Sequence, residues 1–304
     1  MVHEELVFRL NDRGYKNWLK AGRCLLILKD GLHPFTDHYM KAFHGDLLNQ
    51  HSLLRSQCQT SACKPRGNKL SSACRVCSEW QKVILRHHRQ PEATINWDNC
   101  FPPNWRTDYW EVAKAYMPRG QARGKGADQC DASALLNLIN YCKYFSSVNS
   151  QTVREVIRFR NELMHSCDFC VTDEWIRRYH TTLKHFVNHV PEMARAGPQI
   201  DEMLTIDLTV YVSGVDLMDS AGPSDGLDTD SVRDTGAEVV SQWEAELLQE
   251  MLQEFLQGAA EDEDAKTQDT KLLKSLGGFL QANIDLGEKF SAELQAINSL
   301  EVRE

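Results

Sequence analysis

The sequence predicts a mainly α-helical fold, and three observations support that class. Apolar residues recur at steps of three and four along most of the chain, which is the period of one helix face. A strand-like alternation is confined to residues 205–212. Two cysteine pairs lie in a stretch that has neither period. We therefore expect a helical bundle with a cysteine-rich insertion, followed by a C-terminal helical hairpin or short coiled coil.

The N-terminal part predicts two helices and then a long irregular region. Apolar side chains keep helical spacing over residues 15–32 and again over residues 35–43. The period is lost after His51, until another helix begins near Ser78. Residues 91–126 contain four prolines and a glycine-rich run, so they should be mainly irregular and exposed around a short helical patch.

The central part predicts three further helices. Asp131 is a good N-cap for a helix that continues to Phe145. The next helix covers residues 152–165, and a third ends at Pro191. Together these elements indicate a helical domain over residues 1–200, which includes the cysteine-rich basic insertion 52–126. An acidic Gly/Ser/Asp linker, 201–236, and an acidic helical tail, 237–304, complete the chain.

The tail carries two apolar stripes, over residues 240–255 and 273–297. The second stripe alternates steps of three and four, as in a coiled coil. Asn283 and Gly287 interrupt that seam, so an antiparallel hairpin is favoured. The alternative is a coil that binds a protein partner through residues 237–300.

Composition favours an intracellular protein and excludes a membrane-spanning one. The chain has 304 residues, 42% hydrophobic and 25% charged, and no apolar run approaches the ~20 residues that cross a bilayer. The first 15 residues are charged where a signal peptide would be apolar. We expect a cytoplasmic protein, with the nucleus as an alternative. The ten cysteines should then be core thiols or metal ligands rather than disulfides.

The net charge of −9 conceals two parts of opposite sign. Residues 201–304 hold 24 acids and 6 bases, which leaves 19 acids and 28 bases for residues 1–200. A basic domain beside an acidic tail is expected for a polyanion-binding protein whose tail covers the binding surface when the ligand is absent. The alternative is a simple balance for solubility.

The helix over residues 152–165 places a cation on its apolar face. Its apolar side chains lie at steps of three and four, and Arg160 falls on the same stripe. A guanidinium stays charged there, so it needs a carboxylate, a phosphate or water. Asn161 and His165 lie one helical turn apart, close to the same face.

These three residues are candidates for RNA cleavage by the 2′-hydroxyl of the RNA itself. His165 would transfer protons, Arg160 would stabilise the developing charge on phosphorus, and Asn161 is their polar neighbour. No metal is needed, and a homodimer would supply the second histidine. The alternative is structural, with Arg160 tied to an internal acid and His165 at a helix C-terminus.

Residues 156–166 (VIRFRNELMHS) resemble the signature of the HEPN superfamily, an arginine followed by a polar residue and then a histidine. Residues 130–139 (CDASALLNLI) and 15–19 (YKNWL) resemble the HEPN branch of the DAZ-interacting zinc-finger ubiquitin ligase. A closer resemblance is to a vertebrate family with an X-chromosome open-reading-frame designation. That resemblance is carried by KNW at 16–18, CRVCSEW at 74–80, WEVAKA at 110–115 and MPRG at 117–120.

The HEPN resemblance implies a helical bundle that dimerises around the motif. It implies metal-independent endoribonuclease activity in intact members, with Arg160, Asn161 and His165 at the matching positions. Many animal members are thought to bind RNA or proteins without cutting. The long insertion before the motif helix departs from a minimal HEPN domain.

Two cysteine pairs in the insertion have the spacing of a zinc site. Cys58 and Cys63 are separated by four residues, Cys74 and Cys77 by two, and ten residues lie between the pairs. Four thiolates would form a closed, structural Zn site with no position for a catalytic water. The alternatives are unligated thiols, or a site in which Cys100, His87 or His88 replaces one member.

The same insertion is rich in candidate RNA contacts. Eight Lys/Arg and one acid lie between residues 51 and 90, which suits phosphate binding without sequence readout. The candidates are Arg66, Lys69, Arg75, Lys82 and Arg86, with Arg119, Arg123 and Lys125 in a glycine-rich loop. Four tryptophans either stack on bases or, more commonly, pack in the core; they are Trp80, Trp97, Trp105 and Trp110.

Two functional hypotheses follow from these patterns. The first is an RNA-binding HEPN-type protein, a homodimer whose activity extends to metal-independent RNA cleavage if the motif is competent. The second is a non-catalytic dimeric adaptor that binds protein partners through its C-terminal helices.

Overall fold

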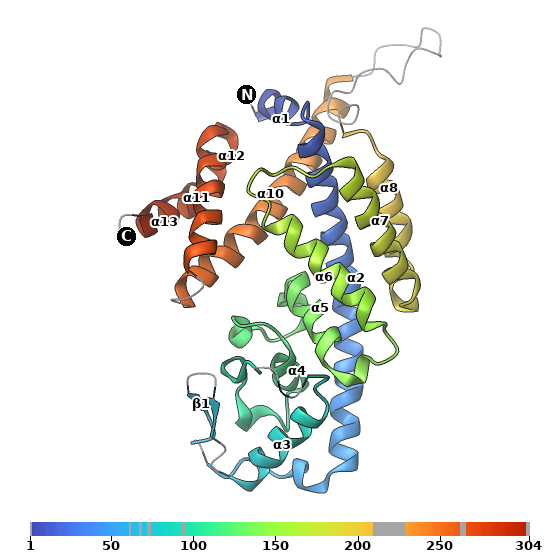
Figure 1. Ribbon diagram of the computed structural model, residues 1–304, viewed down its shortest axis with the longest axis vertical. Coiled ribbons are helices and arrows are strands. Elements are labelled where there is room, and N and C mark those ends of the chain that lie inside the picture. The colour runs from blue at the N-terminus through green and yellow to red at the C-terminus, as the bar shows by residue number, and fades with distance from the viewer. Residues whose placement is uncertain are drawn as a thin grey trace. The chain divides into compact units, whose positions relative to one another are not determined.

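The computed structural model describes residues 2–60, 62–66, 69–71, 74–90, 92, 95–208, 229–261 and 266–301. These residues are mainly helical, which confirms the predicted fold class (Figure 1). The α-helices are α1 (Val2–Arg9), α2 (Arg13–Gln50), α3 (Arg75–Arg86), α4 (Tyr109–Ala113), α5 (Ala132–Tyr141), α6 (Ser150–Met164), α7 (Asp173–Asn188), α8 (Ala196–Thr205), α10 (Thr229–Glu261), α11 (Lys266–Ala282), α12 (Ile284–Lys289) and α13 (Ser291–Glu301).

Shorter elements connect these helices. The 3-10 helices are η1 (Ser52–Arg55), η2 (Trp97–Asn99), η3 (Pro102–Asn104), η4 (Lys114–Tyr116), η5 (Gln121–Arg123), η6 (Ala127–Gln129), η7 (Lys143–Phe145) and η8 (Pro191–Met193). Strands β1 (Pro65–Arg66) and β2 (Lys69–Leu70) form an antiparallel hairpin in which Pro65 faces Leu70. Within the described ranges, every helix is too short or too polar to cross a membrane.

Contacts within the chain divide it into two compact units. Unit 1 comprises residues 1–24, 161–180 and 200–304, and unit 2 comprises residues 25–160 and 181–199. The boundary falls within α2, α6, α7 and α8, so each of these helices contributes to both units. The tail is grouped with residues 1–24 and 161–180, whereas the sequence predicts a separate domain over residues 1–200.

Helix α2 is continuous where the sequence suggested two helices. Pro34 lies inside it and has no backbone N–H to donate. The buried stripe nevertheless continues through Leu32, Phe35 and Phe43, and the Thr36 hydroxyl donates to the Leu32 carbonyl at 2.8 Å. Several buried side chains, worth about 1.5–3 kcal/mol each, outweigh a proline cost of about 3 kcal/mol. The predicted break was therefore wrong.

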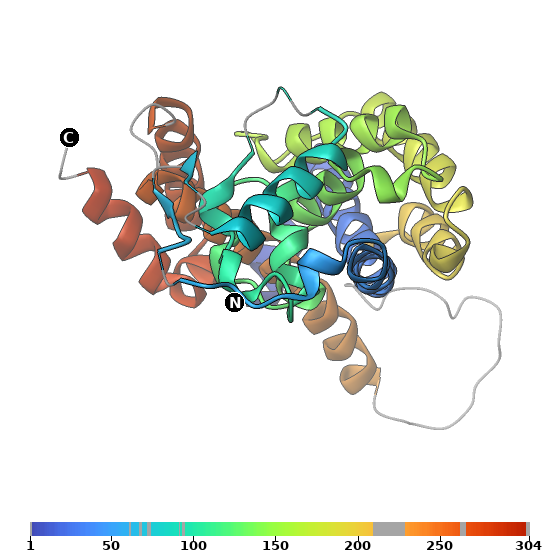
Figure 2. The same ribbon diagram turned by 90° about the horizontal axis from the view of Figure 1, so that it is seen from below.

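Unit 2 is built around the second half of α2. The rings of Phe35 and Tyr39 lie 5.6 and 5.4 Å from that of Phe145 in η7. Asp131 caps α5 as predicted, because its Oδ1 accepts a hydrogen bond from the N–H of Ala134 at 2.8 Å. Figures 1 and 2 show α3 lying between the β1–β2 hairpin and α2.

The described part of the segment 91–126 is less exposed than predicted. It forms a series of short helices, with α4 and η4 at the expected helical patch. Trp97, Trp105, Trp110 and Tyr116 are buried there. Large aromatic side chains therefore form a core in this segment, although its helices are short. The glycine and proline content of the segment did not predict this burial.

Unit 1 packs α10 against the N-terminal part of α2. A Cβ atom on Gly22 would lie 2.0 Å from Cδ2 of Leu247, so the close approach of these helices requires glycine. Trp18 Nε1 donates to the Leu163 carbonyl at 3.3 Å, which joins α2 to the end of α6. The described helices of the acidic tail are therefore part of the folded core of unit 1.

The two apolar stripes of the tail give more than two helices. Helices α10 and α11 contact each other, as expected for a hairpin. The second stripe is divided at Asn283 and Phe290 into α11, α12 and α13. A Cβ atom on Gly287 would lie 2.8 Å from the Leu280 carbonyl oxygen, so glycine permits α12 to turn back closely on α11. The prediction of one continuous helix over residues 273–297, which a coiled coil requires, was therefore wrong.

The region between the bundle and the tail differs from its prediction where it is described. Thr205 is the last residue of α8 and Leu208 is helical, so residues 205–208 do not begin a strand. Residues 201–205 of the predicted linker belong to α8, and residues 209–228, which include the rest of the predicted strand, lie outside the described residues. The linker's last residues belong to α10.

Candidate functional site

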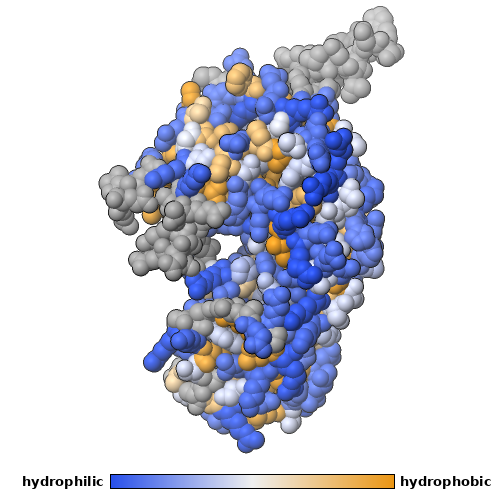
Figure 3. All heavy atoms as spheres, in the orientation of Figure 1, coloured by the Kyte–Doolittle hydropathy of each residue, from blue (hydrophilic) through white to orange (hydrophobic). Residues whose placement is uncertain are grey.

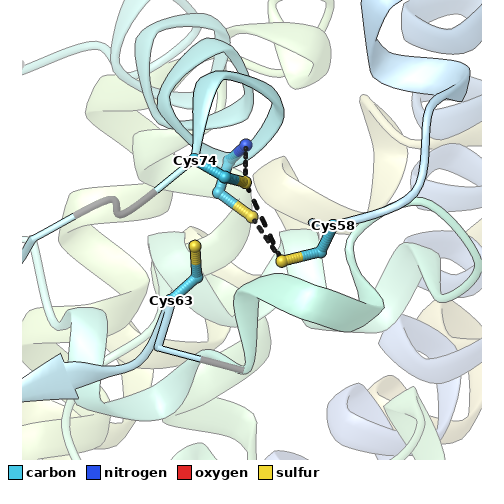
Figure 4. Close-up of side chains that lie close together, drawn as sticks. Cys58, Cys63 and Cys74 are labelled. Atoms are coloured by element: carbon cyan, nitrogen blue, oxygen red, sulfur yellow. Dashed lines mark hydrogen bonds between the residues drawn. The ribbon is translucent and has the colours of Figure 1, made fainter. Parts of the chain in front are cut away.

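Four cysteines of unit 2 form a compact cluster. The Sγ atoms of Cys58, Cys63, Cys74 and Cys77 all lie within 4.8 Å of one another. The Sγ of Cys58 is 3.4 Å from that of Cys77 and 3.9 Å from that of Cys74. In Figure 4 the thiols of Cys58, Cys63 and Cys74 point toward a common centre. The predicted set of ligands is therefore brought together.

Local structure positions the two pairs. Cys58 and Cys63 lie in the loop between η1 and β1, and the short hairpin follows them. Cys74 is the N-cap of α3, and its Sγ accepts a hydrogen bond from the backbone N–H of Cys77 at 3.5 Å. The first turn of a helix thus supplies one pair and the preceding loop supplies the other.

The distances fit a tetrahedral metal site. Four thiolates at about 2.3 Å from a zinc ion are about 3.8 Å apart, close to the separations found here. Three of the cysteines are buried and Cys58 is half-buried, so a bound ion would be closed off from water. The cluster can therefore hold a structural metal ion, with cysteine ligands in all four positions.

The surroundings of Cys74 favour its thiolate. Burial by itself raises the pKa of this thiol, but hydrogen bonds from the backbone N–H groups of Cys77 and Gln59 and from neighbouring thiols lower it to about 6. Burial and hydrogen bonds with the Cys58 and Cys74 thiols raise the pKa of Cys77. A bound cation would favour the thiolate form of each ligand, because metal binding displaces the proton.

The other cysteines are not part of this cluster. Four are buried thiols whose pKa is raised by burial, as expected of inert core residues; they are Cys24, Cys100, Cys130 and Cys142. Cys167 and Cys170 are exposed.

The two histidines considered as substitute ligands have other surroundings. His87 Nδ1 lies 2.9 Å from the Val83 carbonyl oxygen. His88 is stacked on Tyr116 and Tyr141, at 5.6 and 5.2 Å between ring centroids. In the described chain, neither histidine nor Cys100 belongs to the cluster.

All eight predicted RNA-contact residues have exposed side chains. We call them the basic surface: Arg66, Lys69, Arg75, Lys82, Arg86, Arg119, Arg123 and Lys125. The first two lie on the hairpin, the next three on α3, and the last three in or beside η5. Helix η2 contacts both hairpin strands and also η5. The hairpin and the glycine-rich loop, distant in sequence, therefore meet at η2.

The tryptophans of this region serve the core instead. Trp80, Trp97, Trp105 and Trp110 are all no more than 7% exposed. The rings of Trp80 and Trp105 are 6.4 Å apart, and that of Trp97 is 6.1 Å from Trp105. The hypothesis that they stack on RNA bases was therefore wrong, because bases cannot reach them.

The motif arginine is buried beside an acid. Arg160 is 3% exposed, and its Nη2 donates to Oδ2 of Asp131 at 3.1 Å. Asp131 also caps α5, so the ion pair joins α6 to the start of α5 within unit 2. This arrangement is the one expected from the structural alternative for Arg160.

The other two motif residues differ from Arg160 in exposure. Asn161 is exposed, and His165 is half-buried just after the end of α6. The backbone N–H of His165 donates to the Asn161 carbonyl at 2.9 Å, and its ring lies 5.3 Å from that of Phe255 in α10. Arg160 belongs to unit 2, whereas Asn161 and His165 belong to unit 1.

One buried polar cluster, in unit 1, was missed in the sequence. Arg9 donates to both carboxylate oxygens of Glu244, each at 2.7 Å, and to those of Asp285 at 3.0 and 2.8 Å. Burial by itself lowers the pKa of Arg9, but the hydrogen bonds to Asp285 and Glu244 together raise it by more, so the net effect is a raised pKa. The Tyr15 hydroxyl donates to Glu244 at 2.5 Å. Glu244 interrupts the apolar stripe of α10, and a charged residue at such a position indicates a buried partner of opposite charge.

Comparisons with known proteins find a family model and a curated relative, each of which covers nearly the whole chain. The family model described as "Domain of unknown function (DUF4559)" matches residues 9–303. "Uncharacterized protein CXorf38 homolog" of Mus musculus is 38% identical over 312 residues, covering 100% of this chain and 94% of the mouse protein. No solved structure matches. The mouse relative confirms the resemblance to a family with an X-chromosome open-reading-frame designation. The chain belongs to the family described as Domain of unknown function (DUF4559).

Proposed function

We propose that this protein binds RNA through its basic surface, and that a zinc ion held by Cys58, Cys63, Cys74 and Cys77 keeps that surface in shape. One observation carries the proposal: eight exposed cations lie on segments that flank the cysteine cluster or meet at η2. Lysine and arginine at such a surface bind phosphates and release counterions, without reading the base sequence.

Zinc has a specific task in this proposal. Strands β1 and β2 have two residues each, and so short a hairpin is not stable alone. A metal ion would tie the loop before the hairpin to the first turn of α3 after it. The cations on the hairpin and on α3 would then be presented in a fixed arrangement, which lowers the entropic cost of binding.

We choose RNA as the polyanion because the sequences of α5 and α6 resemble those of HEPN domains. We propose a HEPN-like helical bundle that acts as a homodimer and binds RNA. The burial of Arg160 and its ion pair with Asp131 support binding more than cleavage, because a catalytic guanidinium must reach the phosphate. We therefore do not extend the proposal to ribonuclease activity.

Charge reversal on the basic surface tests this proposal. We expect the variant Arg66→Glu, Lys69→Glu, Arg75→Glu, Lys82→Glu to bind a labelled RNA about 100-fold more weakly at low salt. The slope of log affinity against log salt should become shallower by about 0.7 for each lost phosphate contact with single-stranded RNA. Fluorescence anisotropy over a range of salt concentrations measures both quantities.

The control reverses two exposed arginines outside the basic surface, Arg178→Glu and Arg195→Glu, and is compared with the double variant Arg66→Glu, Lys69→Glu, which has the same change in net charge; the control should change affinity less than about threefold. If the four-site variant binds RNA like the wild type, or if the wild type fails to bind RNA at low salt, the proposal is wrong. The adaptor hypothesis, with its partner site on residues 237–300, would then be the better account.

A further inference from the structure

Phe101 is an exposed aromatic residue beside the basic surface. Its side chain is 39% exposed, although phenylalanine is usually buried. It follows η2, the element that contacts both the hairpin and η5. Figure 3 shows hydrophilic side chains beside smaller apolar areas over the lower part of the view, where α3 and the hairpin lie.

The backbone of Phe101 is held firmly in place. Its N–H donates to Oε2 of Glu111 at 2.7 Å, and its carbonyl accepts from Asn104 at 3.0 Å. Glu111 is itself buried and paired with the buried Lys114, whose Nζ lies 2.6 Å from Oε1 of Glu111. The exposed ring therefore lies on an ordered segment, and a ligand that contacts the ring does not have to order this segment first.

A cation lies next to this ring. The Nζ of Lys64 is 5.7 Å from the centroid of the Phe101 ring, within the range of a cation–π interaction. Lys64 immediately precedes β1, which carries Arg66, and Lys69 is on β2. An exposed aromatic face with lysine and arginine beside it is the combination that binds single-stranded nucleic acid, where unpaired bases stack and phosphates meet cations.

We propose that Phe101 stacks on an unpaired base of single-stranded RNA, while Lys64 and the cations of the hairpin contact the neighbouring phosphates. The inference rests on the proposed function and narrows its substrate to single-stranded RNA. Bases inside a duplex are already stacked on each other, so the ring adds nothing to duplex binding.

Variants of Phe101 test the inference in the full-length, zinc-containing protein. The probes are a labelled single-stranded RNA of about 12 nucleotides and a duplex containing the same strand. We expect Phe101→Ala to weaken binding of the single strand about tenfold and leave duplex binding unchanged, whereas Phe101→Trp retains binding of the single strand. Phe8→Ala is the matched control, because Phe8 is 79% exposed on α1 in unit 1; it should change neither affinity.

The outcomes separate this inference from the function on which it rests. Equal weakening for single strand and duplex would overturn the stacking role, as would no effect of Phe101→Ala while the charge-reversal variant loses affinity. In both cases RNA binding by the basic surface stands. Absence of any RNA binding by the wild type would overturn both. Zinc content and the unfolding midpoint of each variant show that the chain is folded.

Discussion

Replacing Cys74 and Cys77 together by serine should remove zinc from the protein and disorder the segment between Cys58 and α3. Four thiolates form a closed tetrahedral site, and binding energies of structural zinc in small fingers reach about 10–16 kcal/mol. Without the ion, a hairpin of two-residue strands keeps its contacts with η2 but loses the link between its preceding loop and α3. The wild type should contain one zinc per chain, and the variant close to none.

Two measurements check this prediction. Elemental analysis gives the zinc content, and limited proteolysis should cut the variant between residues 58 and 74 much faster than the wild type. The control is Cys167→Ser with Cys170→Ser, a pair with the same spacing that is exposed and outside the cluster. It should keep its zinc. Equal and negligible metal in all three proteins would refute the site.

Removing the Arg9 guanidinium should destabilise unit 1 strongly. Arg9→Met leaves two carboxylates without their shared cation, and the side chains of Glu244 and Asp285 are 0% and 4% exposed. Breaking a buried ion pair from one side costs about 3–5 kcal/mol, because the remaining charge is desolvated without a partner. Urea denaturation of the variant and the wild type measures the difference through their transition midpoints.

Arg13→Met is the matched control for this variant. Arg13 also pairs with an acid, Asp173, but its side chain is 79% exposed. Exposed ion pairs contribute about 0–1 kcal/mol, so the midpoint should move little. A similar loss in both variants would mean that burial of the Arg9 pair does not carry the expected energy.

The features predicted correctly depend on residues close together in the sequence. The cap of α5 requires only Asp131 and the three residues after it, and the cysteine cluster requires two pairs at fixed spacing. Local spacing determines where such side chains can point, so a pattern predicts them. The exposure of the basic residues follows similarly, since lysine and arginine are rarely fully buried.

The features that were missed depend on long-range packing. Arg9 and Glu244 are 235 positions apart, and no local pattern at either residue predicts that the two form an ion pair. Pro34 stays inside α2 because its neighbours are buried by distant elements, which local propensity does not include. The buried position of Arg160 was visible in the helical stripe, but the choice between a phosphate and Asp131 as its partner was not.

Binding of RNA to the basic surface can be tested directly by locating the bound RNA on the chain. Full-length wild-type protein would be cross-linked by ultraviolet light to a labelled single-stranded RNA, digested, and analysed by mass spectrometry. We expect cross-linked peptides from residues 58–101 and 118–126. Cross-links confined to unit 1, for example to α10 or α11, would contradict it.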